Sequence, residues 1–555
     1  MPLDVPEDVL YVLCDRLAEV KDFDTLFQCT LSGKRFAVPA LTTLYRHHNA
    51  SPVIGGGGDS DSPPAHVLLL VQKWSIMWRS IIASSLGTTA FPYCRYIRIL
   101  DLRDLSYLLD DEKFDKFKQG DISKNFFSGA MAGFKIMTQP PPSKITGKKR
   151  PRHLDINTIV EAIGDAVTQH TPSIEQITGN VKPSAIIKWA PRLPRLNSLQ
   201  LWGGSALSDP KAQDAIIEHC PKFNALSFYT WTGESADAQL ASFLAGLPPQ
   251  QLKFFEAISH TDIGEGALLS LNSHGESLKY LKMALKSSAL PHLGLLKNCT
   301  ALESLELEHI NVGEDPVDLE ATQHDVFLEV KEWLAQCKQL RTLIFTGFLA
   351  AFKLVTPILY QEDIQLSHLN IDSYVAHNAV EFHRALANHS SLQWLHLAAD
   401  SEGMTRDDID TIVESLTQLH QLRHVKLLGV SDFFNDEHII TLSRNLPHLD
   451  EVYFTGLQVG DVVLPELANL KELRRLDIAS ISTFTFEGLM DFVDRLGPGN
   501  RGIEFMVSSA AQDSKLSDEE VMAINQSFAA KVSGKLDYVP YRDPNEFDMD
   551  ESDSD

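Results

Sequence analysis

Histidine and cysteine, the side chains most often used for metal binding and nucleophilic catalysis, are scattered along the sequence without a catalytic spacing. His420 and His424 are four residues apart, but Gln421 stands where the zinc pattern H-E-x-x-H requires glutamate. No two cysteines have C-x-x-C spacing, and no G-x-S-x-G, dinucleotide-binding or protein-kinase pattern is present. We therefore expect a protein that is not an enzyme and uses no metal and no cofactor.

Large aromatic side chains suggest a different chemistry, the binding of another protein. Trp202, Tyr229 and Phe255 follow one another at intervals of 27 and 26 residues, and Trp231 lies just beyond Tyr229. Trp394 stands further along the chain in a similar apolar setting. Tryptophan and tyrosine dominate binding hot spots because they bury a large area at a low entropic cost. Whether these residues act together depends on the elements that carry them.

A short apolar pattern, L-x-x-L-x-L with Phe, Ile, Val or Met as substitutes, recurs through most of the chain. Successive copies are 24–30 residues apart, except for one interval of 38 that contains the acidic insert 312–324. An isolated early copy consists of Ile97, Leu100 and Leu102. The middle residues of the later copies are at positions 199, 226, 252, 281, 305, 343, 369, 395, 425, 452, 476 and 503.

Each copy of the pattern predicts one short strand, followed in most repeats by an amphipathic helix. Asp209-Pro210 has the chemistry of a helix start, and Thr405 with Asp408 has capping-box spacing. A unit this small cannot bury its own apolar face, so neighbours must stack. The chain therefore resembles a leucine-rich-repeat solenoid of the α/β class, with parallel strands on the concave face and helices on the convex face.

Four of the six cysteines occupy one position of the repeat, three residues before the first apolar residue of the strand pattern. These are Cys94, Cys220, Cys299 and Cys337, and other repeats have leucine or histidine there. Small buried side chains suit that position, so we expect structural thiols and no redox or metal chemistry.

Strand geometry places the aromatic residues on the concave face. Side chains alternate along a strand, so the residue three after each middle position faces away from the core. In three consecutive repeats this residue is Trp202, Tyr229 and Phe255. We predict that these three, with Trp231 and Trp394, bind the protein substrate. The alternative is that a loop or the insert at 103–154 covers them and makes them part of the core.

Residues 5–46 do not follow the repeat and predict three short helices. In order and spacing this segment resembles an F-box, whose pattern begins L-P, continues with an Asp-Leu step and a Cys/Ser turn, and then has an aromatic residue. Here these features are Val5-Pro6, Asp22-Phe23, Cys29-Thr30-Leu31-Ser32 and Phe36, which replaces the usual tryptophan. The alternative is an ordinary helical cap of the solenoid.

An F-box followed by leucine-rich repeats is the architecture of the F-box/leucine-rich-repeat substrate receptors, here in a form that looks fungal. The resemblance implies a non-catalytic subunit of a Skp–cullin–F-box (SCF) ubiquitin ligase, in which other subunits transfer ubiquitin. The F-box would dock to the small adaptor and through it to a cullin, while the repeats capture the substrate for ubiquitin-dependent catabolism. The residues that we expect to bind the adaptor are Pro6, Leu10, Leu13, Leu17, Phe23 and Leu26.

Two alternatives remain open, the first of which belongs to another functional class. One is a ubiquitin-independent leucine-rich-repeat regulator, similar to the Ran GTPase-activating proteins, which also combine such repeats with an acidic tail. The asparagine that usually follows the strand in that family is missing here, as at Gly204 and Trp231. The other is a protein that binds the adaptor but never joins a cullin.

The charge balance limits the partners and the compartment. With 49 Lys+Arg against 74 Asp+Glu, the net charge is −25, which argues against nucleic acid and anionic membranes as partners. No secretory signal is recognisable, and the apolar stretch 67–86 is interrupted by Lys73 and Arg79, so we expect a cytoplasmic or nuclear protein. The basic run Lys148–Arg152 is either a nuclear-import signal or a solvated loop.

The predicted organisation follows from these patterns. It comprises an F-box-like module (1–48), a flexible Gly/Ser/Pro linker (49–66), a capping helix (67–92), the solenoid (93–510) with an irregular insert at about 103–154, a C-terminal cap (511–540) and a disordered acidic tail (541–555).

Overall fold

The computed structural model describes residues 5–46, 65–110, 125–138, 153–310, 316–430, 433–456 and 458–541. The chain divides into two compact units, Met1–Ser277 and Leu278–Asp555. The predicted linker, the basic run Lys148–Arg152 and the predicted acidic tail lie wholly or almost wholly outside the described residues.

The first unit begins with a small three-helix module. Helix α1 spans Glu7–Glu19, α2 spans Phe23–Ser32 and α3 spans Lys34–Arg46. The side chain of Asp22 caps α2 by accepting a hydrogen bond from the Thr25 backbone N–H at 3.0 Å. Cys14, Ala18, Leu26 and Ala40 form the buried core, against which the partly buried Leu17, Phe23, Cys29 and Leu44 pack.

A parallel sheet forms the rest of the first unit. Its strands are β1 (Ile99–Asp101), β4 (Gln176–Gly179), β5 (Ser198–Gly203), β6 (Ala225–Thr230) and β7 (Phe254–Ala257), paired in that order. The α-helices of this unit after α3 are α5 (Ala65–Ser85), α6 (Leu102–Leu109), α9 (Ile156–Thr168), α10 (Pro183–Trp189), α11 (Pro210–His219), α12 (Ala236–Gly246) and α13 (Glu265–Leu271). Its described 3-10 helices are η1 (Tyr93–Arg95), η2 (Gly129–Phe134), η3 (Ala190–Arg192), η4 (Gly204–Leu207) and η5 (Asn272–His274). Within the predicted insert, β2 (Met137–Thr138) pairs antiparallel with β3 (His153–Leu154).

The second unit continues the same parallel pattern. Its main strands, in order of pairing, are β8 (Tyr280–Leu285), β9 (Ser304–His309), β10 (Thr342–Thr346), β11 (His368–Val375), β12 (Trp394–Asp400), β13 (His424–Leu428), β14 (Glu451–Phe454), β16 (Arg475–Ile478), β18 (Glu504–Ala510) and β19 (Lys535–Pro540). Two short strands, β15 (Gln458–Gly460) and β17 (Ile481–Thr483), pair beside them.

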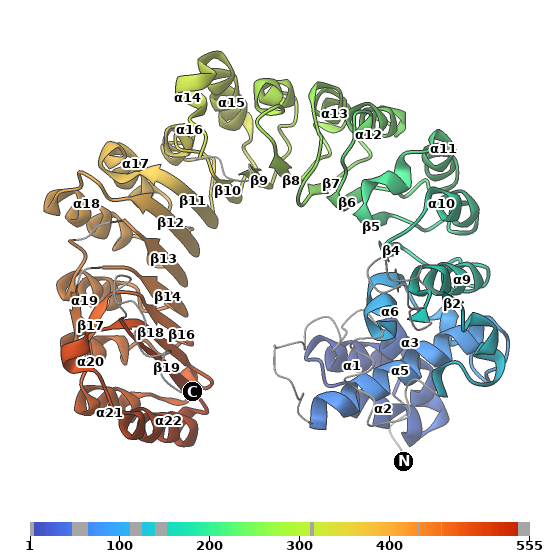
Figure 1. Cartoon of the computed structure of the whole chain (residues 1–555), viewed down its shortest axis with the longest axis horizontal. Helices are drawn as coiled ribbons and strands as arrows, with labels where there is room; N and C mark the ends of the chain where they lie inside the picture. Colours follow the sequence, from blue (N-terminus) through green and yellow to red (C-terminus); the bar gives the residue numbers. More distant parts are fainter. Residues whose placement is uncertain are drawn as a thin grey trace, which may run out of the picture. The chain divides into compact units, whose positions relative to one another are not determined.

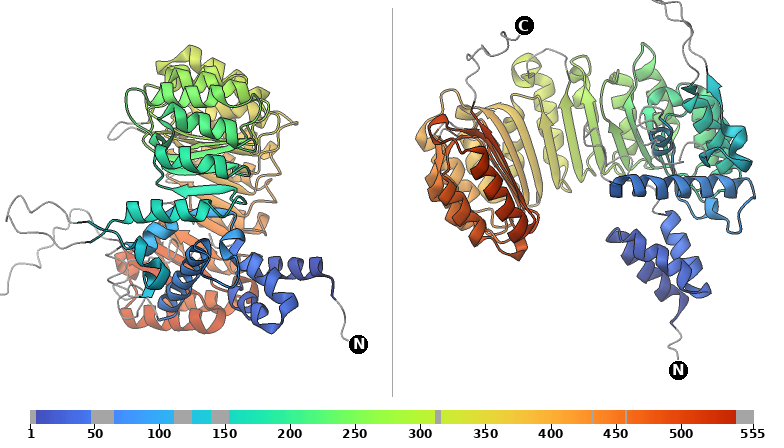
Figure 2. Two further views of the ribbon diagram at one scale, coloured as in Figure 1. Left: turned by 90° about the vertical axis from the view of Figure 1, so that its right-hand side faces the viewer. Right: turned by 60° about the horizontal axis from the view of Figure 1, so that its bottom comes forward.

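Helices cover one side of the strands in each unit (Figure 1). The α-helices of the second unit are α14 (Leu319–Thr322), α15 (His324–Gln336), α16 (Ala351–Leu359), α17 (Val380–Ala385), α18 (Arg406–Leu416), α19 (Asp436–Asn445), α20 (Leu464–Leu467), α21 (Phe486–Arg495) and α22 (Asp518–Val532). The first repeat of this unit has the 3-10 helix η6 (Leu290–Leu296) in place of an α-helix. Further 3-10 helices are η7 (Ala376–Asn378), η8 (Leu386–Asn388), η9 (Asp461–Val463), η10 (Pro498–Asn500) and η11 (Gln512–Ser514). We call the opposite side of the strands the helix-free face. Figure 2 shows the strands and their helices from two further directions.

This architecture confirms the predicted α/β leucine-rich-repeat fold with a small all-α module at its N-terminal end. The expected capping box of Thr405 with Asp408 is present on α18, and Ser517 with Glu520 forms another on α22. Among the described residues, no helix is both long and apolar enough to span a bilayer.

The register of the strands corrects the predicted repeat in three places. Leu226 pairs with Phe255, so Phe255 is the buried middle residue of its repeat and Leu252 is the first residue of the pattern. Leu476 likewise pairs with Phe505, not with residue 503. Strand β4, whose middle residue Ile177 pairs with Leu100 and Leu199, was missed, because Gly179 takes the place of the last apolar residue.

The cysteine position of the repeat is buried, as predicted. Cys94, Cys220, Cys299 and Cys337 are all almost fully inaccessible to solvent. Burial raises the pKa of Cys220, Cys299 and Cys337 to about 12, because a thiolate would lose its hydration. These thiols are therefore protonated at neutral pH and suit a packing role.

Candidate functional site

The first candidate surface belongs to the three-helix module. Of the residues predicted to bind an adaptor, Pro6 and Leu13 are exposed. Leu17 and Phe23 are partly buried against the module core. The prediction is wrong for Leu10 and Leu26, which are buried and cannot contact a partner while the chain is folded.

The exposed apolar residues of the module lie on α1 and α2. Val12 and Leu13 are 62% and 49% exposed, and Val9 lies one turn before Leu13. On α2, Phe27 and Leu31 are exposed four residues apart, so they share one side of the helix. Of these residues only Leu13 was predicted to bind a partner, because α1 carries two apolar stripes and only one of them enters the core.

The module is held to the repeats through α3 and α2. The Tyr45 hydroxyl lies 2.6 Å from the Ser80 hydroxyl of α5, and its ring stacks on that of Tyr93 with centroids 4.7 Å apart. Burial raises the pKa of Tyr45 to about 12, so this hydroxyl stays protonated. On α2, Asp24 pairs with Lys73 of α5 at 2.6 Å. The exposed apolar side chains of α1 and α2 take part in none of these contacts and are therefore available to a partner.

Helix α5 joins the module to the first strand of the sheet. The indole N–H groups of Trp74 and Trp78 both donate to the same carboxylate oxygen of Asp104 on α6, at 2.8 and 2.6 Å. Trp78 and Asp104 are fully buried. This stretch, predicted to cap the first repeats, is thus held to them by two hydrogen bonds to one buried acid.

The second candidate surface is an aromatic pair on the helix-free face of the first unit. Trp202 and Tyr229 stack with ring centroids 4.8 Å apart and an interplanar angle of 14°. They keep 50% and 41% of their area exposed, so no described loop covers them. Two side chains of this size, held parallel on neighbouring strands, form a rigid apolar platform for a partner.

The predicted aromatic column is shorter than expected. Phe255 is fully buried because it is the middle residue of its repeat, and Ile258 takes the position of the third column member. Trp231 is also buried, with its ring edge-on to Phe228 at 5.4 Å. Both predictions of substrate contact are therefore wrong, and these two residues belong to the core.

The third candidate surface is a groove on the helix-free face of the second unit. It crosses β12, β13, β14 and β16 and has a volume of about 260 Å³. One column of aligned residues along it is Trp394, His424, Glu451 and Arg475. The neighbouring column contains Lys426, Tyr453 and Asp477. Trp394, the predicted second anchor, thus lines a groove, whereas the polar residues around it were not predicted.

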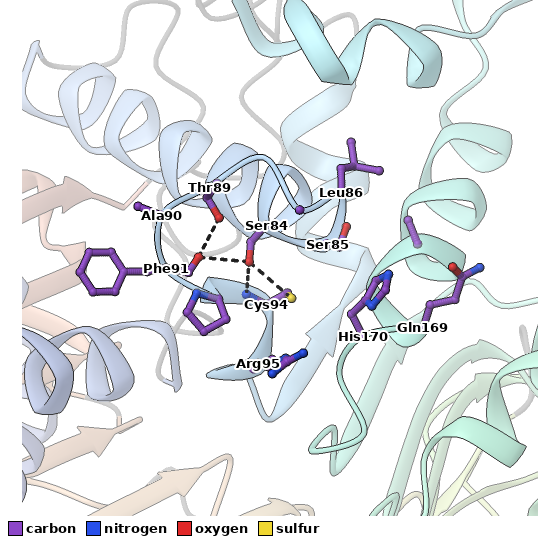
Figure 3. Close-up of a pocket in the computed structure, with 13 residues that line it drawn as sticks. Ser84, Ser85, Leu86, Thr89, Ala90, Phe91, Cys94, Arg95, Gln169 and His170 are labelled. Atoms are coloured by element: carbon purple, nitrogen blue, oxygen red, sulfur yellow. Dashed lines mark hydrogen bonds between the residues drawn. The ribbon is translucent and has the colours of Figure 1, made fainter.

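A larger depression in the first unit has a different character. It has a volume of about 640 Å³ and lies between the turn after α5 and the end of α9 (Figure 3). Ser84 and Thr89 hydrogen-bond to the Phe91 carbonyl, and the Cys94 N–H donates to Ser84 at 3.3 Å. These polar groups are occupied in holding the turn, and the basic residues at the rim, Arg95 and His170, are exposed.

Several buried histidines give the repeats a pH dependence. His383 donates to or accepts from the Tyr374 hydroxyl at 3.0 Å, and burial lowers its pKa from 6.5 to about 4. Burial also lowers the pKa of His274 and His389. No group of three or more potential metal ligands occurs among the described residues.

We expect His383 to make the second unit sensitive to acid. Because the folded pKa lies below the unfolded value, the unfolded chain binds the proton first as the pH falls from 6.5 towards 4. Stability is thus intact above pH 6.5 and lost below it, by about 2 kcal/mol at pH 5 for this residue. Urea unfolding at pH 7 and pH 5 measures the difference.

The matched variants are His383→Gln, which removes the titrating group, and His377→Gln, which changes an exposed histidine of the same repeat. Between pH 7 and pH 5, His383→Gln should lose less stability than the natural chain does. His377→Gln should lose as much stability as the natural chain. An unchanged difference in His383→Gln would contradict this role.

No known family profile and no curated protein sequence matches the chain. Solved structures that resemble it in part include the following two. A chain of the Rad7 and Elc1 complex in yeast has 13% identity and a TM-score of 0.37, covering 64% of this chain and 82% of its own. An internalin, inlF, of Listeria monocytogenes has 15% identity and a TM-score of 0.33, covering 58% and 77%. Neither likeness bears on function.

Proposed function

We propose that this protein is the substrate-recruiting subunit of an SCF-type ubiquitin ligase. The observation that carries the proposal is a compact three-helix module with F-box-like sequence order, joined to leucine-rich repeats, that presents apolar side chains outward. The module would bind the small adaptor, and through it a cullin, while the repeats hold the protein to be modified. The chain itself would catalyse no step.

The exposed residues of α1 and α2 support adaptor binding by the hydrophobic effect. Val12, Leu13, Phe27 and Leu31 leave apolar area in water, which a soluble domain this small has little reason to retain unless a partner covers it. Covering one such side chain contributes about 1.5–3 kcal/mol. Leu26 would act indirectly, because it belongs to the core that holds these helices together.

The repeats would supply the specificity. The Trp202–Tyr229 platform and the groove around Trp394 lie on helix-free faces, where the strands present side chains that no helix covers. We assign both to contact with the protein substrate. Phe255 and Trp231 are left out of this assignment because they are buried.

The test is capture of the adaptor by the variant Val12→Asp with Leu13→Asp. Placing carboxylates in an apolar contact removes the favourable burial and adds an uncompensated desolvation cost. We therefore expect adaptor recovery in a pulldown from co-expressing cells to fall at least tenfold. Both side chains are exposed, so the melting temperature of the chain should be nearly unchanged.

Met522→Asp is the matched control, because Met522 is 62% exposed on a helix of the second unit, as Val12 is on α1. Blotting the same pulldown for a cullin distinguishes the alternatives. Adaptor with cullin supports the proposal, and adaptor without cullin indicates a receptor that acts outside the ligase. Recovery of neither, or equal recovery with the double variant, would leave the ubiquitin-independent regulator as the better explanation.

A further inference from the structure

The groove on the helix-free face of the second unit has a shape suited to side chains. Its volume of about 260 Å³ lies below the roughly 300–1,000 Å³ of pockets that hold drug-sized ligands. It crosses four neighbouring strands, which at about 4.8 Å each give it the length of a few residues of extended chain. A short segment of a partner protein therefore matches it better than a small molecule.

One end of the groove is aromatic. The ring of Trp394 lies at a tilt to that of His368 and edge-on to that of His396, with centroids 6.2 Å apart in both cases. These contacts fix its orientation from the sides, while the same ring also lines the groove. It can therefore receive an aliphatic or aromatic side chain.

The middle of the groove carries a lysine that has no ion-pair partner among the described residues. The Lys426 ammonium group lies 5.3 Å from the centroid of the Tyr453 ring, and no described carboxylate approaches it within 4 Å. Arg475, by contrast, is paired with Asp477 at 3.1 Å. The net charge of −25 repels anions from the chain as a whole, whereas this lysine attracts them locally.

Histidines beside Lys426 have polar atoms without partners. Nε2 of His396 and Nδ1 of His424 are buried and make no hydrogen bond among the described residues. Both residues lie next to Lys426, His396 in register on β12 and His424 two residues before it on β13. Glu451 is 3.5 Å from Nδ1 of His424, without hydrogen-bond geometry.

We propose that this groove binds an extended segment of the protein substrate through one carboxylate next to an apolar side chain. The carboxylate would pair with Lys426, and the apolar side chain would pack on Trp394. The inference rests on the proposed function only in calling the partner a substrate. It concerns one kind of residue pair, an Asp or Glu beside a large apolar residue.

A phosphorylated segment is less suitable for the same groove. A phosphate group carries about −1.5 to −2 charges at neutral pH and is best held by several free cations. Arg475 is already neutralised by Asp477, and Glu451 faces the same groove and would repel a second negative charge. One lysine therefore balances one carboxylate.

The experiment is selection of linear peptides from a random displayed library against the full chain, with counter-selection on Lys426→Met. We expect enrichment of an acidic residue beside an aromatic or aliphatic one. A synthetic peptide with that motif should bind at least about tenfold more tightly than its Glu→Gln or Asp→Asn counterpart. In Lys426→Met this preference should disappear, and in Trp394→Ala both peptides should bind more weakly.

Lys282→Met is the matched control, because Lys282 is on the same face but lies 3.2 Å from Glu306. It should bind the acidic peptide as the natural chain does, and all variants should melt at nearly the same temperature. A basic motif, no motif, or an acidic preference that persists in Lys426→Met would overturn the proposal. Tighter binding of a phosphoserine peptide than of the acidic one would overturn it in favour of a phosphorylated partner.

The outcome is independent of the ligase proposal, because the selection contains no adaptor. If adaptor capture fails but the acidic motif is selected, the proposal for the groove is supported and the proposed ligase function is contradicted. If the adaptor and cullin are captured but no acidic motif is selected, the opposite conclusion holds.

Discussion

Replacing Asp104 by Leu should destabilise the first unit by about 4 kcal/mol, because two indole N–H groups lose their shared acceptor. Trp78 is fully buried, so its N–H would have no access to water in the variant. A buried donor without a partner costs about 1–3 kcal/mol, and the indole N–H of the partly buried Trp74 loses its acceptor as well. Urea unfolding monitored by tryptophan fluorescence measures the loss.

The matched variant is Asp104→Asn. Both indoles donate to the same oxygen, and an amide retains one carbonyl oxygen that can accept two hydrogen bonds. We expect Asn to preserve most of the stability that Leu removes. Equal losses in the two variants would show that the negative charge, and not the shared acceptor, holds α5 to α6.

Replacing Gly204 by Ala should cost about 3 kcal/mol, since the added Cβ would lie 2.1 Å from Cε3 of Trp231. The Trp231 ring is buried and packs edge-on against Phe228, so it cannot turn away without opening the core. The shift would also disturb the end of β5, and we expect the exposed Trp202–Tyr229 pair to lose part of its order. Thermal unfolding and near-ultraviolet circular dichroism report the two effects.

Gly203→Ala provides the comparison within the same turn. Its Cβ would meet only Ser205 Oγ at 3.4 Å and the Thr230 carbonyl at 4.0 Å, which is ordinary contact. Its backbone, at φ −126° and ψ 129°, is open to any residue. This variant should be as stable as the natural chain. If both alanine variants lose the same stability, the clash with Trp231 is not the cause.

The fold was predictable because its main signal repeats. Each strand contributes the same apolar spacing, so an error in one copy leaves the assignment of the others intact. Errors occurred where the spacing was degenerate. Leu252 with Phe254 has the spacing of a middle and a last residue, although Phe255 is the middle one, and Ile177 is followed by Gly179 where another apolar residue was expected. Only hydrogen-bonded register distinguishes these cases.

The candidate surfaces were less predictable, for a geometric reason. Alternation along a strand was enough to find Trp202, Tyr229 and Trp394. The groove residues Lys426 and His396 are polar positions between leucines, and their proximity depends on register across strands. On α1, composition cannot show which stripe faces inward, so Leu10 and Leu13 looked equivalent although only Leu13 is exposed.

The shared cysteine position has a practical consequence for measuring how the chain opens. Cys220, Cys299 and Cys337 sit at equivalent buried places in three different repeats, and each thiol must be exposed before an alkylating reagent can reach it. Their labelling rates, resolved by mass spectrometry, therefore report local opening repeat by repeat, with the partly exposed Cys29 as an internal standard for reagent access. The natural sequence thus carries its own set of probes for fraying along the array.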